Sequence, residues 1–398
     1  MQLWLLAPQH HPFTINLSAK RMTSLVANTQ LPAKPEYPGL ANAFGIDLDV
    51  LKNLANTWST TYSWEAEQAK FNKYDHYTAT IEGLTIHFIH QKSGQKDAIP
   101  LILNHGWPET FQDFLPLVAG LTGVSKTPGG KSVSFDVIIP SLPGFTFSSA
   151  PPANWTLDDT ARVFNTLMTE VLGYTTYAAF GTDWGSAVAY SLYGTYNTTV
   201  RALALDYLPF FAIPETSLEA DNITLDSFGV LAYQLYAAAL ATGTGYFVEQ
   251  NTEPNTIGLA LYDNPVGQLA WIADKVILWS DPRAGTNGSL ITPETTLNTV
   301  SLYYLTGSFV SSVFTYAQNP NGFKSIYSKA PTDAPLLFSA FQYNNQYWPP
   351  AVVAMVGNLT SYTEHTFGGH FSGLDNPSGL LSDLIKIGDY YQTSHTGC

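Results

Sequence analysis

Short apolar runs alternate with helically spaced segments in the middle of the chain. Four of these runs are rich in branched and aromatic residues and are bounded by turn-forming residues, at 84–89, 100–104, 135–140 and 177–180. Near-continuous apolar runs of this length suit strands that are buried on both faces of a parallel sheet. Helical spacing at 111–121 and 157–172 lies between them. The pattern therefore predicts an α/β fold in which helices are wound around a mostly parallel sheet.

The periodicity changes on both sides of this central region. The leader, which is the first 80 residues, has the pattern of helices and loops. After a strand at 200–205, a long helical pattern follows without a convincing strand. Strand patterns return at 336–341 and 359–362, before a terminal helix at 379–391. We expect one core with an inserted helical cap. The expected parts are an N-terminal meander (1–80), a first core part (81–206), the cap (207–330) and a second core part (331–398).

The composition excludes several classes of partner. The chain has 398 residues, a formal net charge of −14 and only 17 Lys and Arg residues, so no basic stripe exists to bind nucleic acid or an anionic membrane surface. No run reaches the roughly 18 to 20 apolar residues of a membrane span. The opening Met1–Ala7 is at most the remnant of a signal peptide. The single cysteine, Cys398, excludes an internal disulfide framework and a cysteine-based metal site, and we expect neither metal nor cofactor.

Targeting is indicated only indirectly. Acceptor sequences for N-glycosylation occur at Asn16, Asn154, Asn197, Asn222, Asn287 and Asn358. Together with the scarcity of lysine and the single cysteine, they favour a secreted glycoprotein, with a cytoplasmic location as the alternative. A homodimer is compatible with the sequence, which does not determine the oligomeric state.

The segment Gly181-Thr182-Asp183-Trp184-Gly185 follows a strand and precedes a helical pattern. This spacing is typical of a nucleophile elbow, in which small flanking residues permit a tight turn that pushes the central side chain into a pocket. The central residue is aspartate, and a carboxylate nucleophile most usefully displaces a leaving group from a tetrahedral carbon to form an alkyl-enzyme ester. The substrate would then be an epoxide or an alkyl halide. Taken alone, an ordinary aspartate in a glycine-rich turn would give the same pattern.

Two further segments supply the groups that hydrolysis of such an ester needs. The HGWP segment at 105–108 directly follows a strand, where a backbone amide completes an oxyanion hole in hydrolases of this architecture. We expect the amides of Trp107 and Trp184 to form it. The GGHF segment at 368–371 follows the last strand and places His370 on a loop, in the chain order nucleophile, acid, base. His370 is therefore the candidate base that activates water.

The motifs HGWP, PSLPGFTFSS, GTDWGS and GGHF occur in this order and spacing, and together they resemble the microsomal-type epoxide hydrolases, especially fungal ones. The resemblance covers essentially the whole chain. It implies an α/β-hydrolase core with a helical cap and an N-terminal meander. It also implies that two cap tyrosines hydrogen-bond and protonate the oxygen of a small apolar epoxide, which is opened to a vicinal diol. The best matches for these tyrosines are Tyr246 and Tyr316.

One position departs from the family's pattern. The triad acid of the family follows the penultimate core strand, and the matching residue here is Asn344. An amide can accept a hydrogen bond from His370 but cannot stabilise an imidazolium by charge. Asp206, at the end of the strand at 200–205, is the candidate for a replacement acid, so the two positions would have exchanged identities. The alternative is that Asp206 only caps the first turn of the cap.

Two other activities remain open at this level. A haloalkane dehalogenase would share Asp183, His370 and an acid near Asp206, and the indole of Trp184 would hold the halide. The two tyrosines and the long leader favour the epoxide. The second alternative is a hydrolase fold that has altered or lost its hydrolytic activity because Asn344 replaces the usual acid. A pure binding protein would have no need of Asp183, His370 and an oxyanion hole together.

Overall fold

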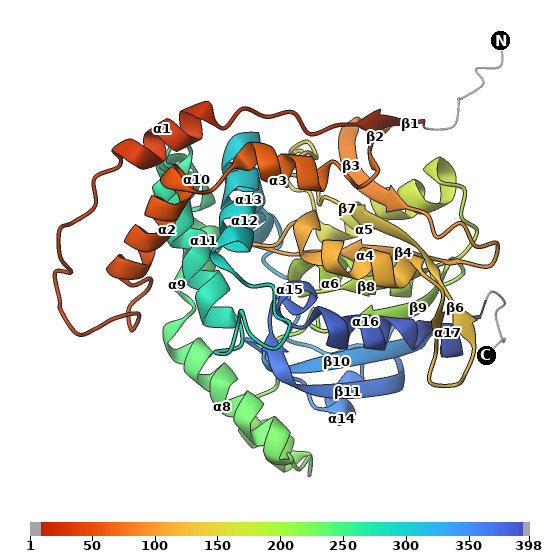
Figure 1. The fold of residues 1–398 in the computed structure, drawn as a ribbon. Helices are drawn as coiled ribbons and strands as arrows, with labels where there is room; N and C mark the ends of the chain where they lie inside the picture. The colour runs from red at the N-terminus through yellow and green to blue at the C-terminus, as the bar shows by residue number, and fades with distance from the viewer. Residues whose placement is uncertain (1–8, 393–398) are drawn as a thin grey trace.

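The computed structural model describes residues 9–392, and within this range a nine-stranded sheet forms the centre of the molecule (Figure 1). Its spatial order is β1 (His10–Phe13), β2 (His76–Ile81), β3 (Leu84–Gln91), β7 (Phe135–Pro140), β4 (Ile99–Asn104), β8 (Tyr177–Gly181), β9 (Val200–Leu205), β10 (Pro335–Tyr343) and β11 (Asn358–Gly369). In this spatial order the strands β7, β4, β8, β9, β10 and β11 are parallel, whereas β1, β2 and β3 add an antiparallel edge. The α/β-hydrolase fold that the sequence predicts is confirmed.

The parallel strands are buried because helices cover the sheet. Leu101, Ile102 and Leu103 of β4 are fully buried, as continuous apolar runs require. The covering helices are α4 (Leu115–Thr122), α5 (Leu157–Thr166), α6 (Asp183–Thr195), α14 (Pro350–Val353), α15 (Ser372–Asp375), α16 (Pro377–Ile385) and α17 (Ile387–Tyr390). Short turns at Phe111–Phe114 and Leu167–Val171 extend α4 and α5, and β5 (Ser125–Lys126) and β6 (Ser132–Val133) form a separate hairpin.

The N-terminal segment differs from the expected helices and loops because it also contributes β1 and β2 to the sheet. Only four residues form β1, and two of them are histidines and one is proline, so no apolar alternation marks it as a strand. Its helices are α1 (Lys20–Asn28), α2 (Leu48–Thr60) and α3 (Trp64–Phe71). They contact α11 (Pro265–Trp279) and α12 (Pro293–Thr306), which belong to the helical insertion between β9 and β10 that we call the cap. Trp58 of α2 donates a hydrogen bond from Nε1 to Ser301 Oγ at 3.0 Å. The segment therefore spans from the sheet edge to the cap.

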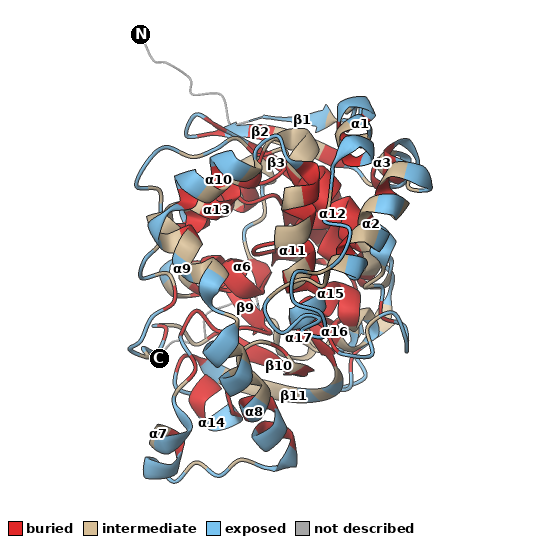
Figure 2. Cartoon of the chain, turned by 90° about the vertical axis from the view of Figure 1, so that its left-hand side faces the viewer, coloured by how far each residue is buried: buried red, intermediate tan, exposed pale blue. Residues whose placement is uncertain are grey.

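Helices occupy the chain between β9 and β10. They are α7 (Glu215–Ala220), α8 (Ser227–Thr242), α9 (Gly245–Thr252), α10 (Pro254–Leu261), α11 (Pro265–Trp279), α12 (Pro293–Thr306) and α13 (Phe309–Gln318). A single bridge between Phe210 and Lys324 joins the two ends of this insertion. In Figure 2 the inner strands β9 and β10 are buried, whereas α7 and α8 carry much exposed surface. Within residues 9–392, no helix has the length and hydrophobicity needed to cross a membrane.

Candidate active site

Asp183 stands at the turn from β8 into α6, at the carboxyl edge of the parallel strands. Its backbone φ of 44° is positive, a strained conformation for a residue with a side chain. The turn is tight because α6 starts directly against β4: a Cβ added to Gly185 would lie 2.1 Å from the carbonyl oxygen of Asn104. Asp183 is 5% exposed. The expected elbow geometry is therefore present, with a buried carboxylate at its centre.

The HGWP segment delivers a backbone donor to this carboxylate. The Trp107 amide donates to Asp183 Oδ1 at 2.8 Å, and the two chains approach so closely that a Cβ on Gly106 would lie 2.2 Å from the same oxygen. Burial raises the pKa of Asp183 to about 7, although hydrogen bonds from the amides of Trp107 and Trp184 act in the opposite direction. The two amides expected to form the oxyanion hole therefore converge on one carboxylate, as an oxyanion at that position would require.

His370 lies near the second carboxylate oxygen of Asp183, the one that the Trp107 amide does not contact. Its Nε2 is 3.6 Å from Asp183 Oδ2 and has no hydrogen-bond partner among the described residues. The ring is fully buried, and this burial lowers the pKa of His370 to about 3. The imidazole is therefore neutral at ordinary pH, which is the form that accepts a proton. A water molecule beside the Asp183 carboxylate would therefore meet a neutral imidazole nitrogen that can accept its proton.

The partner of His370 differs from the expected one. His370 Nδ1 hydrogen-bonds Asn344 Oδ1 at 2.9 Å, and Asn344 Nδ2 donates to the backbone oxygen of Asp206 at 3.2 Å. The expectation that Asp206 contacts a His370 ring nitrogen is wrong. Its carboxylate instead accepts a hydrogen bond from Ser372 Oγ, at the start of α15. Burial raises the pKa of Asp206 to about 7.

The two cap tyrosines lie against the tryptophans of the oxyanion region. The Tyr246 ring stacks on Trp107 with centroids 5.6 Å apart and an angle of 9° between the planes. The Tyr316 ring meets Trp184 edge to face at 4.8 Å. Burial raises the pKa of both phenols, so both hydroxyls keep their protons and remain hydrogen-bond donors. The Tyr316 hydroxyl is buried and has no hydrogen-bond partner among the described residues.

A cavity of about 240 Å³ lies between the core and the cap, and its lining includes the nucleophile and both cap tyrosines but not His370. Asp183, Tyr246 and Tyr316 all line it, and the rest of its wall is mainly aromatic. The remaining aromatic lining residues are Tyr207, Phe211, Tyr236, Phe247, Trp279 and Phe323. Asn345 and Gln346 supply the amide groups. The cavity therefore favours a small, mostly apolar molecule with one reactive polar atom.

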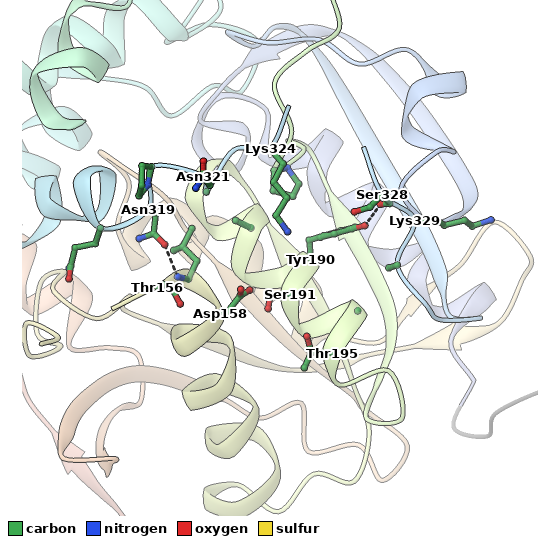
Figure 3. A pocket seen from close by; sticks show the side chains of 18 of the residues that line it. Thr156, Asp158, Tyr190, Ser191, Thr195, Asn319, Asn321, Lys324, Ser328 and Lys329 are labelled. Carbon is green, nitrogen blue, oxygen red and sulfur yellow. Dashed lines mark hydrogen bonds between the residues drawn. The ribbon is translucent and has the colours of Figure 1, made fainter. Parts of the chain in front are cut away.

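A larger groove of about 680 Å³ lies on the outer side of α6 (Figure 3). Polar side chains line it, including Ser191 and Thr195 of α6 and Lys324 from the end of the cap. Neither Asp183 nor His370 is among its lining residues. The smaller aromatic cavity contains Asp183, Tyr246 and Tyr316, which the groove lacks, so the cavity is the candidate active site.

Sequence reasoning missed one buried acid beside the nucleophile. Glu109 follows the HGWP segment, is 1% exposed, and accepts a hydrogen bond from the Gly106 amide. Burial, followed by the charges of Asp113 and Asp183, raises the pKa of Glu109 well above its usual range. Its bond to Gly106 holds the turn that aims the Trp107 amide at Asp183. The sequence offers one indication of this role, because Glu109 directly follows the HGWP segment, which is expected to lie beside Asp183.

The other sequence-predicted positions lie away from the cavity. Five of the glycosylation acceptors are exposed, namely Asn16, Asn154, Asn222, Asn287 and Asn358. Asn197 is half-buried, and its Nδ2 donates to the backbone oxygen of Pro331. Cys398 and Met1–Ala7 lie outside the described residues. Across residues 9–392, no group of three or more His, Cys, Asp or Glu side chains has an arrangement suited to a metal ion.

Comparisons with known proteins agree with this geometry. Residues 10–114 match the family described as epoxide hydrolase N terminus, and residues 99–246 match the α/β hydrolase fold. The structure of Aspergillus niger epoxide hydrolase is 32% identical, with a TM-score of 0.82 over 97% of both chains. Epoxide hydrolase 1 of Sus scrofa is 30% identical over 86% of this chain and 80% of its own. The juvenile hormone epoxide hydrolase of Bombyx mori, 23% identical, shares the fold with a TM-score of 0.84 over 96% of this chain and 94% of its own. The chain therefore belongs to the epoxide hydrolases of the α/β-hydrolase superfamily.

Proposed function

We propose that this epoxide hydrolase works through a covalent ester on Asp183. In the first half-reaction one carboxylate oxygen of Asp183 attacks an epoxide carbon, and the carbon–oxygen bond of the ring breaks. Tyr246 and Tyr316 donate hydrogen bonds to the epoxide oxygen, and one of them gives it a proton as the ring opens. The observation that carries the proposal is the shared cavity, in which both protonated phenols and the carboxylate face the same space.

The second half-reaction releases the diol. His370 Nε2 takes a proton from water as the water oxygen attacks the ester carbonyl carbon of Asp183. The amides of Trp107 and Trp184 stabilise the negative charge on the carbonyl oxygen, because they already point to the carboxylate in the resting structure. The bond between the acyl carbon of Asp183 and the substrate oxygen then breaks, and that oxygen takes the proton from the His370 imidazolium to complete the diol. The proton of the added hydroxyl returns to the tyrosine that protonated the epoxide, and the Asp183 carboxylate keeps one oxygen from water.

The substrate that this cavity favours is a small apolar epoxide. Its volume of about 240 Å³ is below the roughly 300–1,000 Å³ of pockets for drug-sized ligands. The aromatic side chains of Tyr207, Phe247 and Trp279 supply flat apolar surface. A compact aryl or alkyl epoxide such as styrene oxide meets both requirements.

A single-turnover experiment tests this mechanism. The protein is mixed with substoichiometric styrene oxide, quenched at intervals, and weighed intact by mass spectrometry. We expect the mass of one styrene oxide on Asp183 in the parent protein, a lasting adduct in His370→Gln, and neither adduct nor diol in Asp183→Asn. In water enriched in oxygen-18 the first turnover should label Asp183 and leave the diol unlabelled. Diol formation by Asp183→Asn at the parent rate would contradict the mechanism.

A second candidate activity is displacement of halide from a haloalkane. The indole Nε1 groups of Trp107 and Trp184 are buried and have no hydrogen-bond partner among the described residues, and the two rings pack against the cavity residues Tyr246 and Tyr316. Two such donors could hydrogen-bond a departing halide ion. As with an epoxide, the displacement would leave an alkyl ester on Asp183. Release of bromide from 1-bromobutane, measured with the parent protein and with Tyr246→Phe/Tyr316→Phe, tests this activity separately from epoxide opening.

We also propose that the protein is secreted, carries N-linked glycans and forms a homodimer. Four exposed acceptors, Asn16, Asn154, Asn222 and Asn287, support the glycans, since an attached sugar needs free space at the amide nitrogen. Asn358 is exposed too, but its Nδ2 donates to the backbone oxygen of Asp333. Expression in a eukaryotic secretion host, followed by intact-mass measurement before and after endoglycosidase treatment, tests both secretion and glycosylation. Sedimentation velocity of the deglycosylated protein tests the dimer.

A further inference from the structure

The loop that carries His370 is held by two buried carboxylates that lie outside the cavity. Asp375, at the end of α15, is fully buried, and its Oδ2 accepts a hydrogen bond from the Gly369 amide at 2.9 Å. Asp281, in the cap just after α11, accepts a hydrogen bond on Oδ2 from the Gly368 amide at 2.9 Å. Each carboxylate therefore holds one of the two amides that immediately precede the base.

The two carboxylates are also joined to each other. The Asp281 amide donates to Asp375 Oδ2 at 2.7 Å, so this single oxygen receives amides from both the cap and the histidine loop. Ser289 Oγ donates to the other Asp375 oxygen at 2.9 Å. The printed hydrogen bonds of the Asp375 carboxylate therefore join α15 to the histidine loop and to the cap, and none of these partners lines the cavity.

Arg283 completes the link between the cap and the last strand. Its Nη2 donates to Asp281 Oδ2 at 2.6 Å and to the backbone oxygen of Thr366 in β11 at 2.6 Å. The guanidinium lies over the rings of Tyr343 and Phe367, at 5.3 and 4.9 Å from their centroids. Charged hydrogen bonds of this kind are stronger than neutral ones, so Arg283 fixes the Asp281 carboxylate in place.

The backbone of the loop is in direct contact with the cap. The His370 amide donates to the Trp279 carbonyl oxygen at 2.8 Å, and a Cβ on Gly369 would lie 2.4 Å from that oxygen. Gly368 has a φ of +102°, which glycine adopts without strain. The GG pair therefore allows the loop to fold against the end of α11.

We propose that Asp281 and Asp375 are positioning residues for the water-activating base of this enzyme. They set the direction of the His370 ring by holding the two amides before it, and they couple that direction to the placement of the cap. This inference rests on the proposed function, in which His370 acts only in the hydrolysis of the ester. Loss of either carboxylate should therefore slow ester hydrolysis far more than alkylation, because a small displacement of a general base is costly.

The test measures the two half-reactions separately in Asp375→Asn and Asp281→Asn. Styrene oxide is added in single turnover, and the amounts of ester and diol are followed by quenched-flow mass spectrometry. We expect the rate of ester hydrolysis to fall by about tenfold or more, and that of alkylation by less than about twofold. The ester should therefore accumulate in steady state. Equal slowing of both steps, or an unchanged ratio of their rates in folded protein, would overturn the proposal.

Two controls separate positioning from stability. Asp383 is a similarly buried carboxylate that holds His365 in the same strand β11, at 2.6 Å, but contacts neither glycine of the loop. Asp383→Asn should lower the thermal midpoint without changing the ratio of the two rates. If the Asp variants fail to fold, Arg283→Gln replaces them, because its side chain is 46% exposed and its loss weakens the hold on Asp281 and on β11 while both carboxylates stay in place. It should shift the ratio in the same direction, and an unchanged ratio there also overturns the proposal.

Failure of the proposed mechanism has a different signature. If the parent protein and His370→Gln form no ester on Asp183 while diol still appears, the covalent mechanism fails and the positioning role loses its basis. If the parent forms the ester but the Asp variants hydrolyse it at the parent rate, only the positioning role fails. Asp375→Glu provides a rescue test, since a carboxylate that still reaches Gly369 should recover part of the hydrolysis rate.

Discussion

His370 Nδ1 lies 2.9 Å from Asn344 Oδ1, and this contact determines which nitrogen of the base is free. Asn344 Nδ2 donates to the backbone oxygen of Asp206, and Asn344 Oδ1 also accepts the Asn345 amide, so the side-chain oxygen must face the ring. His370 Nδ1 therefore carries the proton, and the lone pair of Nε2 faces Asp183. An amide thus supplies the tautomer that a triad acid would select, but without its charge.

Exchange of this amide for a carboxylate should accelerate the second half-reaction. In Asn344→Asp the new charge stabilises the imidazolium that forms when water is deprotonated, so ester hydrolysis should be at least about tenfold faster. Alkylation should change little, because His370 stays neutral in that step. Single-turnover decay of the ester gives the rate. A hydrolysis rate at or below that of the parent would show that charge at this position does not limit the reaction.

Asn344→Leu provides the opposite change. The ring then has no partner for Nδ1, and ester hydrolysis should be slower than in the parent by about tenfold or more. Asp206→Asn should have the smaller effect, because its carboxylate bonds Ser372 and makes no contact with the ring. If Asp206→Asn proved the more damaging of the two, a charge effect through space would have to replace the direct contact in the mechanism.

The tyrosine hydroxyls should be needed only for alkylation. In Tyr246→Phe and Tyr316→Phe the rings remain against Trp107 and Trp184, but one donor to the epoxide oxygen is lost in each. We expect about a hundredfold slower alkylation for each, with ester hydrolysis near the parent rate. Stopped-flow quenching of tryptophan fluorescence on adduct formation gives the first rate. Equal loss in both half-reactions would instead indicate that the phenols hold the cavity in shape.

The two half-reactions should depend differently on pH. The pKa of Asp183 is raised to about 7, and only the ionised carboxylate attacks, so alkylation should fall about tenfold per unit as the pH drops below this value. The pKa of His370 is lowered to about 3, so the base is neutral from pH 5 to 9 and ester hydrolysis should be flat over that range. Rates measured for each step across these pH values check the difference. A flat alkylation profile would contradict the raised pKa of the nucleophile.

The buried carboxyl group of Asp206 should make the folded protein less stable at and above about pH 7 than near pH 4. The pKa of Asp206 is raised from 3.8 to about 7, so the folded chain keeps a proton that the unfolded chain releases. Stability therefore falls as the pH rises from about 4 to about 7 and is constant above that window. Asp206→Asn removes this cost, and its thermal midpoint should exceed that of the parent by a few degrees at pH 8. The gain should vanish near pH 4, and the exposed Asp263→Asn should show no gain at either pH.

Much of this architecture could be predicted from the sequence because it rests on local patterns. The buried strands have continuous apolar runs, and the elbow at Asp183 needs small residues at fixed positions on either side. The direction of the Asp206 side chain could not be predicted, because it depends on the hydroxyl of Ser372, 166 residues further along the chain. The roles of Asp281 and Asp375 were also hidden, since they bond backbone amides, which leave no mark in a sequence.

The leader described above has a mechanical consequence for the cavity. The reactive groups come from two bodies, with Asp183 and His370 on the core and the tyrosines on the cap. The N-terminal segment is attached to the sheet edge through β1 and to the cap through the hydrogen bond between Trp58 and Ser301. It therefore connects the core to the cap. We therefore expect that the cap does not open as one rigid unit. Epoxide and diol would then enter and leave through local movements of α8 and the start of α9. Leu240 and Thr244 lie there, line the cavity and are exposed to solvent.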